Sequence, residues 1–136
     1  TEKSMTRFSI FLDQGVEAVL WSIQNAKGGE IIIPKAPSLK IMDLAEVIAG
    51  KKIKIIGKRP GEKLHEELIS QSESYHTVDL GKYYAILPEN NFDRSFKYYK
   101  KIKQVKKFTP GLPYNSKDNK NFFNKKDIKD LIHKIS

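Results

Sequence analysis

The chain carries one strongly charged segment in its middle, Lys58-Arg59-Pro60-Gly61-Glu62-Lys63-Leu64-His65-Glu66-Glu67. Its Pro-Gly pair predicts a turn, because proline restricts φ and glycine tolerates positive φ. The apolar residues that follow recur at helical spacing, so we predict that the turn opens an amphipathic helix over residues 62–69. Such a turn can present the guanidinium of Arg59 and the carboxylate of Glu62 to a phosphorylated ligand.

The segments before this turn predict strands and helices in alternation. We expect a helix over residues 12–23 that ends before a Gly-Gly pair, and a second helix over residues 38–50. The β-branched runs at 31–33 and 53–56 are too short for helices and apolar on both faces, which is typical of strands inside a covered parallel sheet. The order of these elements implies an α/β fold. The residues that we expect on the buried face of the first helix are Val16, Val19, Leu20 and Ile23.

The segments after the turn have a weaker pattern. Residues 83–87 are strand-like, and residues 88–124 have no sustained period, so we predict a loop-rich lobe that its many aromatic residues attach to the body. A last helix is expected over residues 126–135, with Asn124 as its cap.

Length and composition indicate one domain. The 136 residues can bury a modest core, and 39% of them are hydrophobic. No apolar run approaches the roughly 20 residues that span a bilayer. The absence of cysteine excludes a disulfide scaffold and a thiolate zinc site. The opening residues lack the features of a signal peptide, so we expect a cytoplasmic protein.

The positive charge is concentrated near the end of the chain. Residues 1–90 hold 12 Lys and Arg against 12 Asp and Glu, whereas residues 91–136 hold 13 against 4. We therefore divide the domain into an α/β portion, 1–90, and a basic, aromatic-containing lobe, 91–136. One functional alternative follows, a basic adaptor that binds nucleic acid or anionic surfaces through residues 94–134. Against it, Arg94 is the single arginine of this lobe, and lysine is usually a solvated surface residue.

The turn resembles a known family when it is read with two further motifs, Thr6-Arg7-Phe8 and Gly28-Gly29-Glu30-Ile31-Ile32-Ile33-Pro34. Together they resemble the C-terminal part of bacterial nucleotide-sugar 4,6-dehydratases and epimerases, over about residues 5 to 90. These enzymes belong to the extended short-chain dehydrogenase/reductase superfamily and act in polysaccharide biosynthesis. The resemblance implies an α/β substrate-binding portion that lacks the N-terminal dinucleotide-binding Rossmann region. Consistent with this, the eight glycines form no G-x-G-x-x-G motif.

The resemblance implies roles for three residues. Arg7 and Arg59 match the positions that hold the nucleotide diphosphate, and arginine suits phosphate because its planar fork is always charged. Glu62 matches the acid that accepts hydrogen bonds from the ribose hydroxyls. Two plainer interpretations remain open. Arg7 can be a surface residue paired with an acid such as Glu2 or Asp13, and the Arg59–Glu62 pair can be a simple helix-capping turn.

The resemblance also implies an activity and its partners. The complete enzyme would be a UDP-N-acetylglucosamine 4,6-dehydratase or a UDP-sugar 4-epimerase for capsule, O-antigen or lipopolysaccharide synthesis. It would use NAD(P) and form a homo-oligomer. By itself this chain is expected to bind UDP-sugar, to bind no NAD(P) and to be inactive, because the partner that it lacks is the N-terminal dinucleotide-binding portion.

Two other patterns invite a catalytic or metal interpretation, and we expect neither. Tyr99 and Lys103 have the Tyr-x-x-x-Lys spacing of the family's catalytic pair, but lysine is so frequent here that chance explains the match. His65 and Glu66 begin a zinc motif, H-E-x-x-H, that Ile69 interrupts. No catalytic residue and no metal ligand is therefore predicted in this chain.

Overall fold

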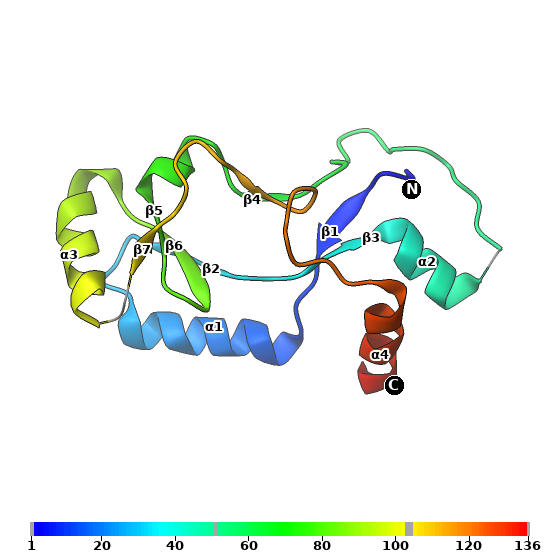
Figure 1. The fold of residues 1–136 in the computed structure, drawn as a ribbon, viewed down its shortest axis with the longest axis horizontal. Coiled ribbons are helices and arrows are strands. Elements are labelled where there is room, and N and C mark those ends of the chain that lie inside the picture. Colours follow the sequence, from blue (N-terminus) through cyan, green and yellow to red (C-terminus); the bar gives the residue numbers. More distant parts are fainter. Residues whose placement is uncertain (1, 51, 103–104, 136) are drawn as a thin grey trace. The chain divides into compact units, whose positions relative to one another are not determined.

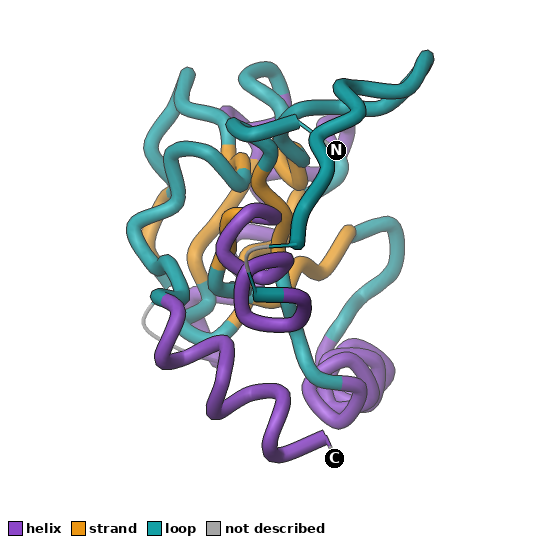
Figure 2. The backbone as a smooth tube through the Cα atoms, turned by 90° about the vertical axis from the view of Figure 1, so that its right-hand side faces the viewer, coloured by secondary structure: helices purple, strands orange, loops and turns teal. Residues whose placement is uncertain are grey.

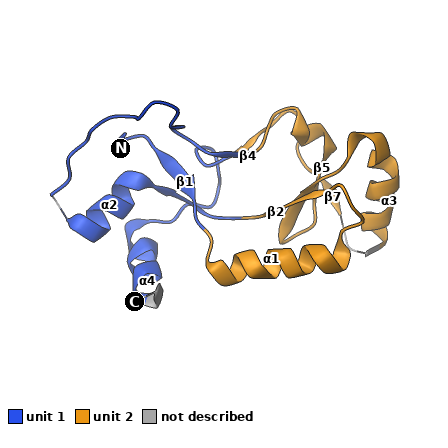
Figure 3. Ribbon diagram, turned by 180° about the vertical axis from the view of Figure 1, so that it is seen from behind, with its two compact units in different colours: residues 1–9, 36–67, 115–136 blue, residues 10–35, 68–114 orange. Residues whose placement is uncertain are grey.

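A computed structural model of the chain describes residues 2–50, 52–102 and 105–135. They form two compact units, each built from segments that are distant in the sequence (Figure 3). Unit 1 contains residues 1–9, 36–67 and 115–136, and unit 2 contains residues 10–35 and 68–114. The basic lobe is thus shared between the units, because its helical end belongs to unit 1.

Unit 1 combines one strand pair with two helices. Strands β1 (Thr6–Phe8) and β3 (Ser38–Lys40) are antiparallel. Helix α2 (Ile41–Ala49) follows β3 directly and packs against α4 (Lys125–Ile135) (Figure 1). Ion pairs join the two helices, since the Nζ atom of Lys125 lies 3.7 Å from Oδ1 of Asp43 and also contacts the carboxylate of Glu46.

Unit 2 is built on a four-stranded antiparallel sheet. Figure 2 shows the backbone of the chain with helices, strands and loops in different colours. Across the sheet the strands are β2 (Ile31–Pro34), β6 (Tyr83–Ile86), β5 (Thr77–Asp79) and β7 (Lys106–Lys107). The other elements of this unit are α1 (Leu12–Asn25), the 3-10 helices η1 (Glu73–His76) and η2 (Glu89–Asn91), and α3 (Phe92–Ile102). The unit boundary runs through β4 (Glu67–Ile69) and β8 (Tyr114–Asn115).

The mixed α/β class is confirmed, as are several of its elements. Helices form at α1, α2 and α4, and a strand forms at β6, within a few residues of the predicted bounds. Asn124 caps α4 as predicted, because its Oδ1 accepts hydrogen bonds from the backbone N–H groups of Lys126 and Asp127 at 2.8 and 3.0 Å.

The two predicted buried strands behave differently from the prediction. Residues 31–34 do form β2, but it pairs antiparallel with β6 and lies at the edge of the sheet, where Ile31 is 56% exposed. Residues 53–56 form no strand. β-Branched composition favours an extended backbone, but a strand also needs a neighbour for its hydrogen bonds, and none of the described residues supplies one here.

Helix α1 turns its apolar stripe away from the core, so the predicted burial of this face is wrong. Trp21 and Ala18 face the sheet, and the ring of Trp21 lies 4.9 Å from that of Tyr83. The opposite face is exposed to solvent, with Leu12 86% and Ile23 75% accessible. The large apolar residues exposed on α1 are Leu12, Val16, Val19, Leu20 and Ile23. We call these five residues the α1 apolar face.

The helix predicted over residues 62–69 is also wrong, because this segment contains turns followed by strand β4. A helix would need the carbonyls of its first turns as acceptors for its own N–H groups. The carbonyl of Leu64 instead accepts from the N–H of Thr6 at 3.0 Å, and that of Lys63 accepts from Arg7 at 2.9 Å. Tertiary contacts thus take the hydrogen bonds that the helix requires.

The predicted loop-rich lobe contains one helix that the pattern analysis missed, α3. Its signal is the i, i+4, i+7 spacing of Phe92, Phe96 and Tyr99, which frequent lysines obscure. The prediction that aromatic residues attach this lobe is confirmed, since Tyr99 is buried in the core of unit 2 and Phe92 and Phe96 pack against that core. The buried members of this core are Val78, Leu80, Ala85, Leu87 and Tyr99.

Candidate functional site

The charged turn is closed by reciprocal hydrogen bonds between its first and last functional residues. The backbone N–H of Arg59 donates to Oε2 of Glu62 at 3.1 Å, and the N–H of Glu62 donates to the carbonyl of Arg59 at 3.1 Å. Gly61 has a φ of 77°, a conformation that favours glycine. This local geometry leaves the guanidinium of Arg59 exposed, and within the described residues it has no hydrogen-bonding partner.

Arg7 connects strand β1 to the turn. Its Nη1 donates to the carbonyls of Thr6 and Leu64 at 2.7 and 3.2 Å, and its Nη2 donates to the carbonyl of Lys63 at 2.9 Å. Its Nε lies 3.3 Å from Oε1 of Glu66. A guanidinium has five N–H groups, so this set of contacts leaves one N–H on Nη2.

A second network attaches the same segment to β1, and sequence reasoning did not find it. The hydroxyl of Thr6 lies 2.8 Å from Nδ1 of His65 and 2.7 Å from the hydroxyl of Ser116. The Ser116 hydroxyl also accepts from the N–H of Glu66 at 2.9 Å. Thr6 and Ser116 are both buried, so their hydroxyls need these partners. Isolated hydroxyl residues so far apart in the chain carry no sequence signal for such a network.

The structure therefore brings Arg7 close to the segment that contains Arg59 and Glu62. The acid that pairs with Arg7 is Glu66, rather than Glu2 or Asp13. An exposed guanidinium can bind a doubly charged anion, and the carboxylate of Glu62 can accept from hydroxyl groups beside it. Arg7 is largely occupied by protein partners, whereas Arg59 has its full set of donors available.

The Tyr-x-x-x-Lys and H-E-x-x-H patterns of the sequence can be compared with the structure only in part. Tyr99 is buried in unit 2, where its hydroxyl donates to Oε1 of Glu30 at 3.2 Å. Burial raises the pKa of Tyr99, which is the opposite of what a tyrosine base needs. Lys103 lies outside the described residues. Within the described ranges, no group of three or more His, Cys, Asp or Glu side chains could hold a metal ion.

Comparison with known proteins identifies the family. A sequence model described as "Polysaccharide biosynthesis protein" matches residues 1–88. The chain belongs to this family. The resemblance derived from the arginine motifs is thereby confirmed.

Relatives in this family include enzymes of nucleotide-sugar metabolism. The chain is 41% identical to a UDP-N-acetylglucosamine 4,6-dehydratase (inverting) from Campylobacter jejuni, over 98% of this chain and 41% of that protein. It is 36% identical to a UDP-glucose 4-epimerase from Rickettsia bellii, over 97% of this chain and 39% of that protein. The X-ray structure of Pen from Bacillus thuringiensis matches with a TM-score of 0.79 and 30% identity, over 100% of this chain and 39% of that one. The chain therefore spans about two fifths of the length of these relatives.

Among the described residues, no helix is long and apolar enough to cross a membrane.

Proposed function

We propose that this chain is the UDP-sugar-binding part of a nucleotide-sugar 4,6-dehydratase or 4-epimerase for surface polysaccharide synthesis. The observation that carries the proposal is that Arg7 binds the carbonyls of Lys63 and Leu64, directly after the turn whose Arg59 side chain is exposed. The names of the Campylobacter and Rickettsia relatives supply the substrate class. UDP carries two phosphoryl groups, and arginine binds such groups with two parallel N–H donors.

Each of the three residues has a distinct proposed role. Arg59 binds the diphosphate directly, because its donors are available and exposed. Arg7 positions the turn through its carbonyl contacts and adds positive charge and one remaining N–H toward the phosphates. Glu62 accepts a hydrogen bond from a ribose hydroxyl with the carboxylate oxygen that the Arg59 N–H does not use.

Hydride transfer requires a second portion of protein, which we propose to be a dinucleotide-binding portion with NAD(P). The relatives are more than twice as long as the segment that they share with this chain, so they have room for it.

The α1 apolar face supports this proposal. Five large apolar side chains on one face of a helix are typical of a surface that another element covers. We propose that the dinucleotide-binding portion packs on this face, and that the complete enzyme is a homo-oligomer.

The function can be tested by supplying the 136-residue chain with UDP-N-acetylglucosamine and NAD(P), beside a polypeptide that also carries a dinucleotide-binding portion. We expect product from the longer polypeptide and none from the chain by itself. A 4-keto sugar identifies the dehydratase, and a C4 epimer identifies the epimerase. Turnover by the 136-residue chain alone would refute the proposal that hydride transfer requires a second portion of protein.

A separate set of variants tests whether UDP binds at the charged turn or at the basic lobe. If the basic lobe bound the ligand instead, Lys106→Ala with Lys107→Ala would lower UDP affinity more than Arg59→Ala. Both lysines are exposed on β7 and lie outside the turn. We expect the reverse order, and binding of UDP in preference to other polyanions.

A further inference from the structure

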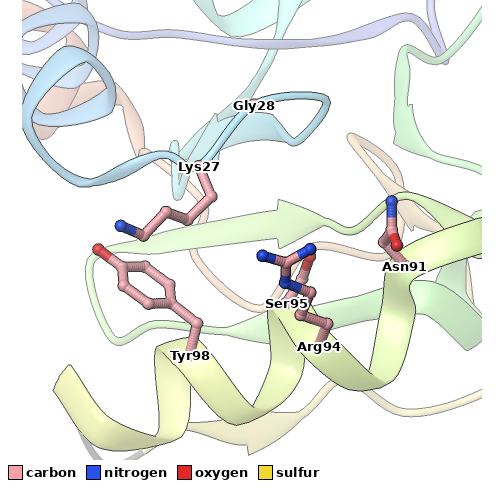
Figure 4. A pocket seen from close by; sticks show the side chains of 6 residues that line it. All are labelled: Lys27, Gly28, Asn91, Arg94, Ser95 and Tyr98. Carbon is pink, nitrogen blue, oxygen red and sulfur yellow. The ribbon is translucent and has the colours of Figure 1, made fainter.

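A polar pocket lies in unit 2, between the loop after α1 and helix α3. It has a volume of about 380 Å³, which is within the range of small-molecule sites. Figure 4 shows the six residues that line it, which are Lys27, Gly28, Asn91, Arg94, Ser95 and Tyr98. The lining contains two cationic side chains and no carboxylate. It does not include any residue of the charged turn, which belongs to unit 1.

Three polar side chains of this pocket form no hydrogen bond with any residue that the structure describes. Ser95 is only 9% exposed, yet its hydroxyl forms no hydrogen bond with any described residue. The same holds, across residues 2–50, 52–102 and 105–135, for the side chains of Asn91 and Arg94. Because the Ser95 Oγ atom is not completely enclosed by protein, a ligand in the pocket can reach this hydroxyl and accept its hydrogen bond.

The remaining walls shape the pocket and add charge. The ammonium of Lys27 lies 4.2 Å from the centre of the Tyr98 ring, which holds it over the pocket without neutralising it. The nearby carboxylate of Glu30 is occupied, because it accepts from the backbone N–H groups of Lys27 and Gly28 at 3.2 and 2.7 Å. Arg94 and Ser95 lie in the first turns of α3, where the helix dipole also favours an anion.

From this arrangement we propose that the pocket binds the phosphate group of a small phosphorylated molecule. The guanidinium and the ammonium supply two positive charges, and the amide and the hydroxyl add further donors. This set suits a phosphate group, which carries close to two negative charges and three strong acceptor oxygens. This site shares no residue with the proposed UDP site, and its residues all belong to unit 2, so the proposal does not depend on the proposed function.

The test is equilibrium dialysis with radiolabelled inorganic phosphate at physiological ionic strength, using the protein that carries this chain with Arg59→Ala, so that the charged turn contributes little. Within that background we expect Arg94→Ala to weaken phosphate binding roughly 10-fold or more, and Ser95→Ala by roughly 3- to 10-fold. Arg94→Lys keeps the charge without the planar fork and should recover only part of the loss. The matched control is Lys97→Ala, on the same helix but outside the pocket, which should change affinity less than about 2-fold.

Two further binding measurements distinguish binding in this pocket from non-specific binding to surface charge. Acetate should compete poorly if the pocket prefers phosphate. Equal competition by acetate would overturn the assignment to a phosphate group. A single-stranded oligonucleotide that binds tightly, and whose binding falls equally with Arg94→Ala and Lys97→Ala, would indicate an open basic surface and also overturn the proposal. Unchanged phosphate binding in Arg94→Ala, with the helical content of that variant intact, would do the same.

Discussion

The Nε atom of Arg7 lies 3.3 Å from Oε1 of Glu66, although the two residues are far apart in the sequence. The same guanidinium donates to the carbonyls of Lys63 and Leu64. One side chain thus defines the path of the segment that contains Arg59 and Glu62. Because Arg7 is engaged and Arg59 is not, the two arginines should respond differently to substitution.

Arg7→Ala is expected to lower stability. The change removes charge-assisted hydrogen bonds to the carbonyls of Thr6, Leu64 and Lys63, and one such bond contributes about 1.5–3 kcal/mol. We expect the free energy of unfolding to fall by an amount in this range, measured by urea denaturation. Arg59→Ala is the control and should leave stability nearly unchanged, since the guanidinium that it removes has no partner among the described residues. Equal losses in both variants would contradict a structural role specific to Arg7.

Arg59→Ala is expected to lower UDP affinity instead. Losing hydrogen bonds of about 1.5–3 kcal/mol to a charged group corresponds to a weakening of roughly 10- to 150-fold. Arg59→Lys should recover little, because lysine keeps the charge but cannot form two parallel N–H contacts. Calorimetric titration of the complete protein with UDP measures both. Full recovery of UDP affinity in Arg59→Lys would show that a positive charge at this position is sufficient and that two parallel N–H contacts are not needed.

Glu62→Gln is expected to have a smaller effect than Arg59→Ala. Glutamine keeps one acceptor oxygen, so it can preserve either the bond to the Arg59 N–H or the bond to ribose. We expect the preference for UDP over its 2′-deoxy analogue to narrow, as measured by competitive binding. An unchanged preference for UDP over the 2′-deoxy analogue would show that Glu62 does not bind the ribose hydroxyl.

Val19→Glu is expected to reduce self-association of the 136-residue chain. Val19 lies on the α1 apolar face, and burying one such side chain contributes about 1.5–3 kcal/mol. Gln24→Glu is the matched control, because it adds the same charge to an exposed polar position of α1. Sedimentation velocity across a concentration series distinguishes the two. If the unsubstituted chain remains monomeric at high concentration, the apolar face does not drive association.

Tyr84 should make the stability of unit 2 sensitive to alkaline pH. Burial, with a smaller contribution from Asp79, raises the pKa of Tyr84 to about 12, above the ordinary value of 10.0. The folded state favours the neutral phenol, so its stabilising contribution is complete below about pH 10 and is lost as the pH rises toward 12.

The variant Tyr84→Phe removes this titration and keeps the ring contacts with Phe108 and Tyr114. Its unfolding free energy should therefore fall less steeply across this pH range than that of the unsubstituted protein. Thermal melts over the same range measure the difference. Parallel pH profiles would show that Tyr84 is solvated in the folded state.

Local pattern was sufficient for several parts of this structure. The helical spacing of apolar residues predicted α1, α2 and α4, and Asn124 marked the start of the last of these. The motifs around Arg7 and Arg59 predicted the family, which the comparison confirms. These features depend on residues close together in sequence, where periodicity and capping act directly.

Tertiary contacts decided the rest. The periodicity of residues 12–23 located a helix, but which face meets the core depended on Trp21 packing against Tyr83. The sequence around residue 64 favours a helix, yet β1 takes its carbonyls. Local periodicity was enough to locate α1, α2 and α4, and the arginine motifs were enough to indicate the family. Which strands pair, and which face of a helix meets the core, depended on the folded structure. A backbone carbonyl accepts a hydrogen bond from whichever donor the whole chain places beside it, and an apolar stripe packs against whichever surface the chain places there.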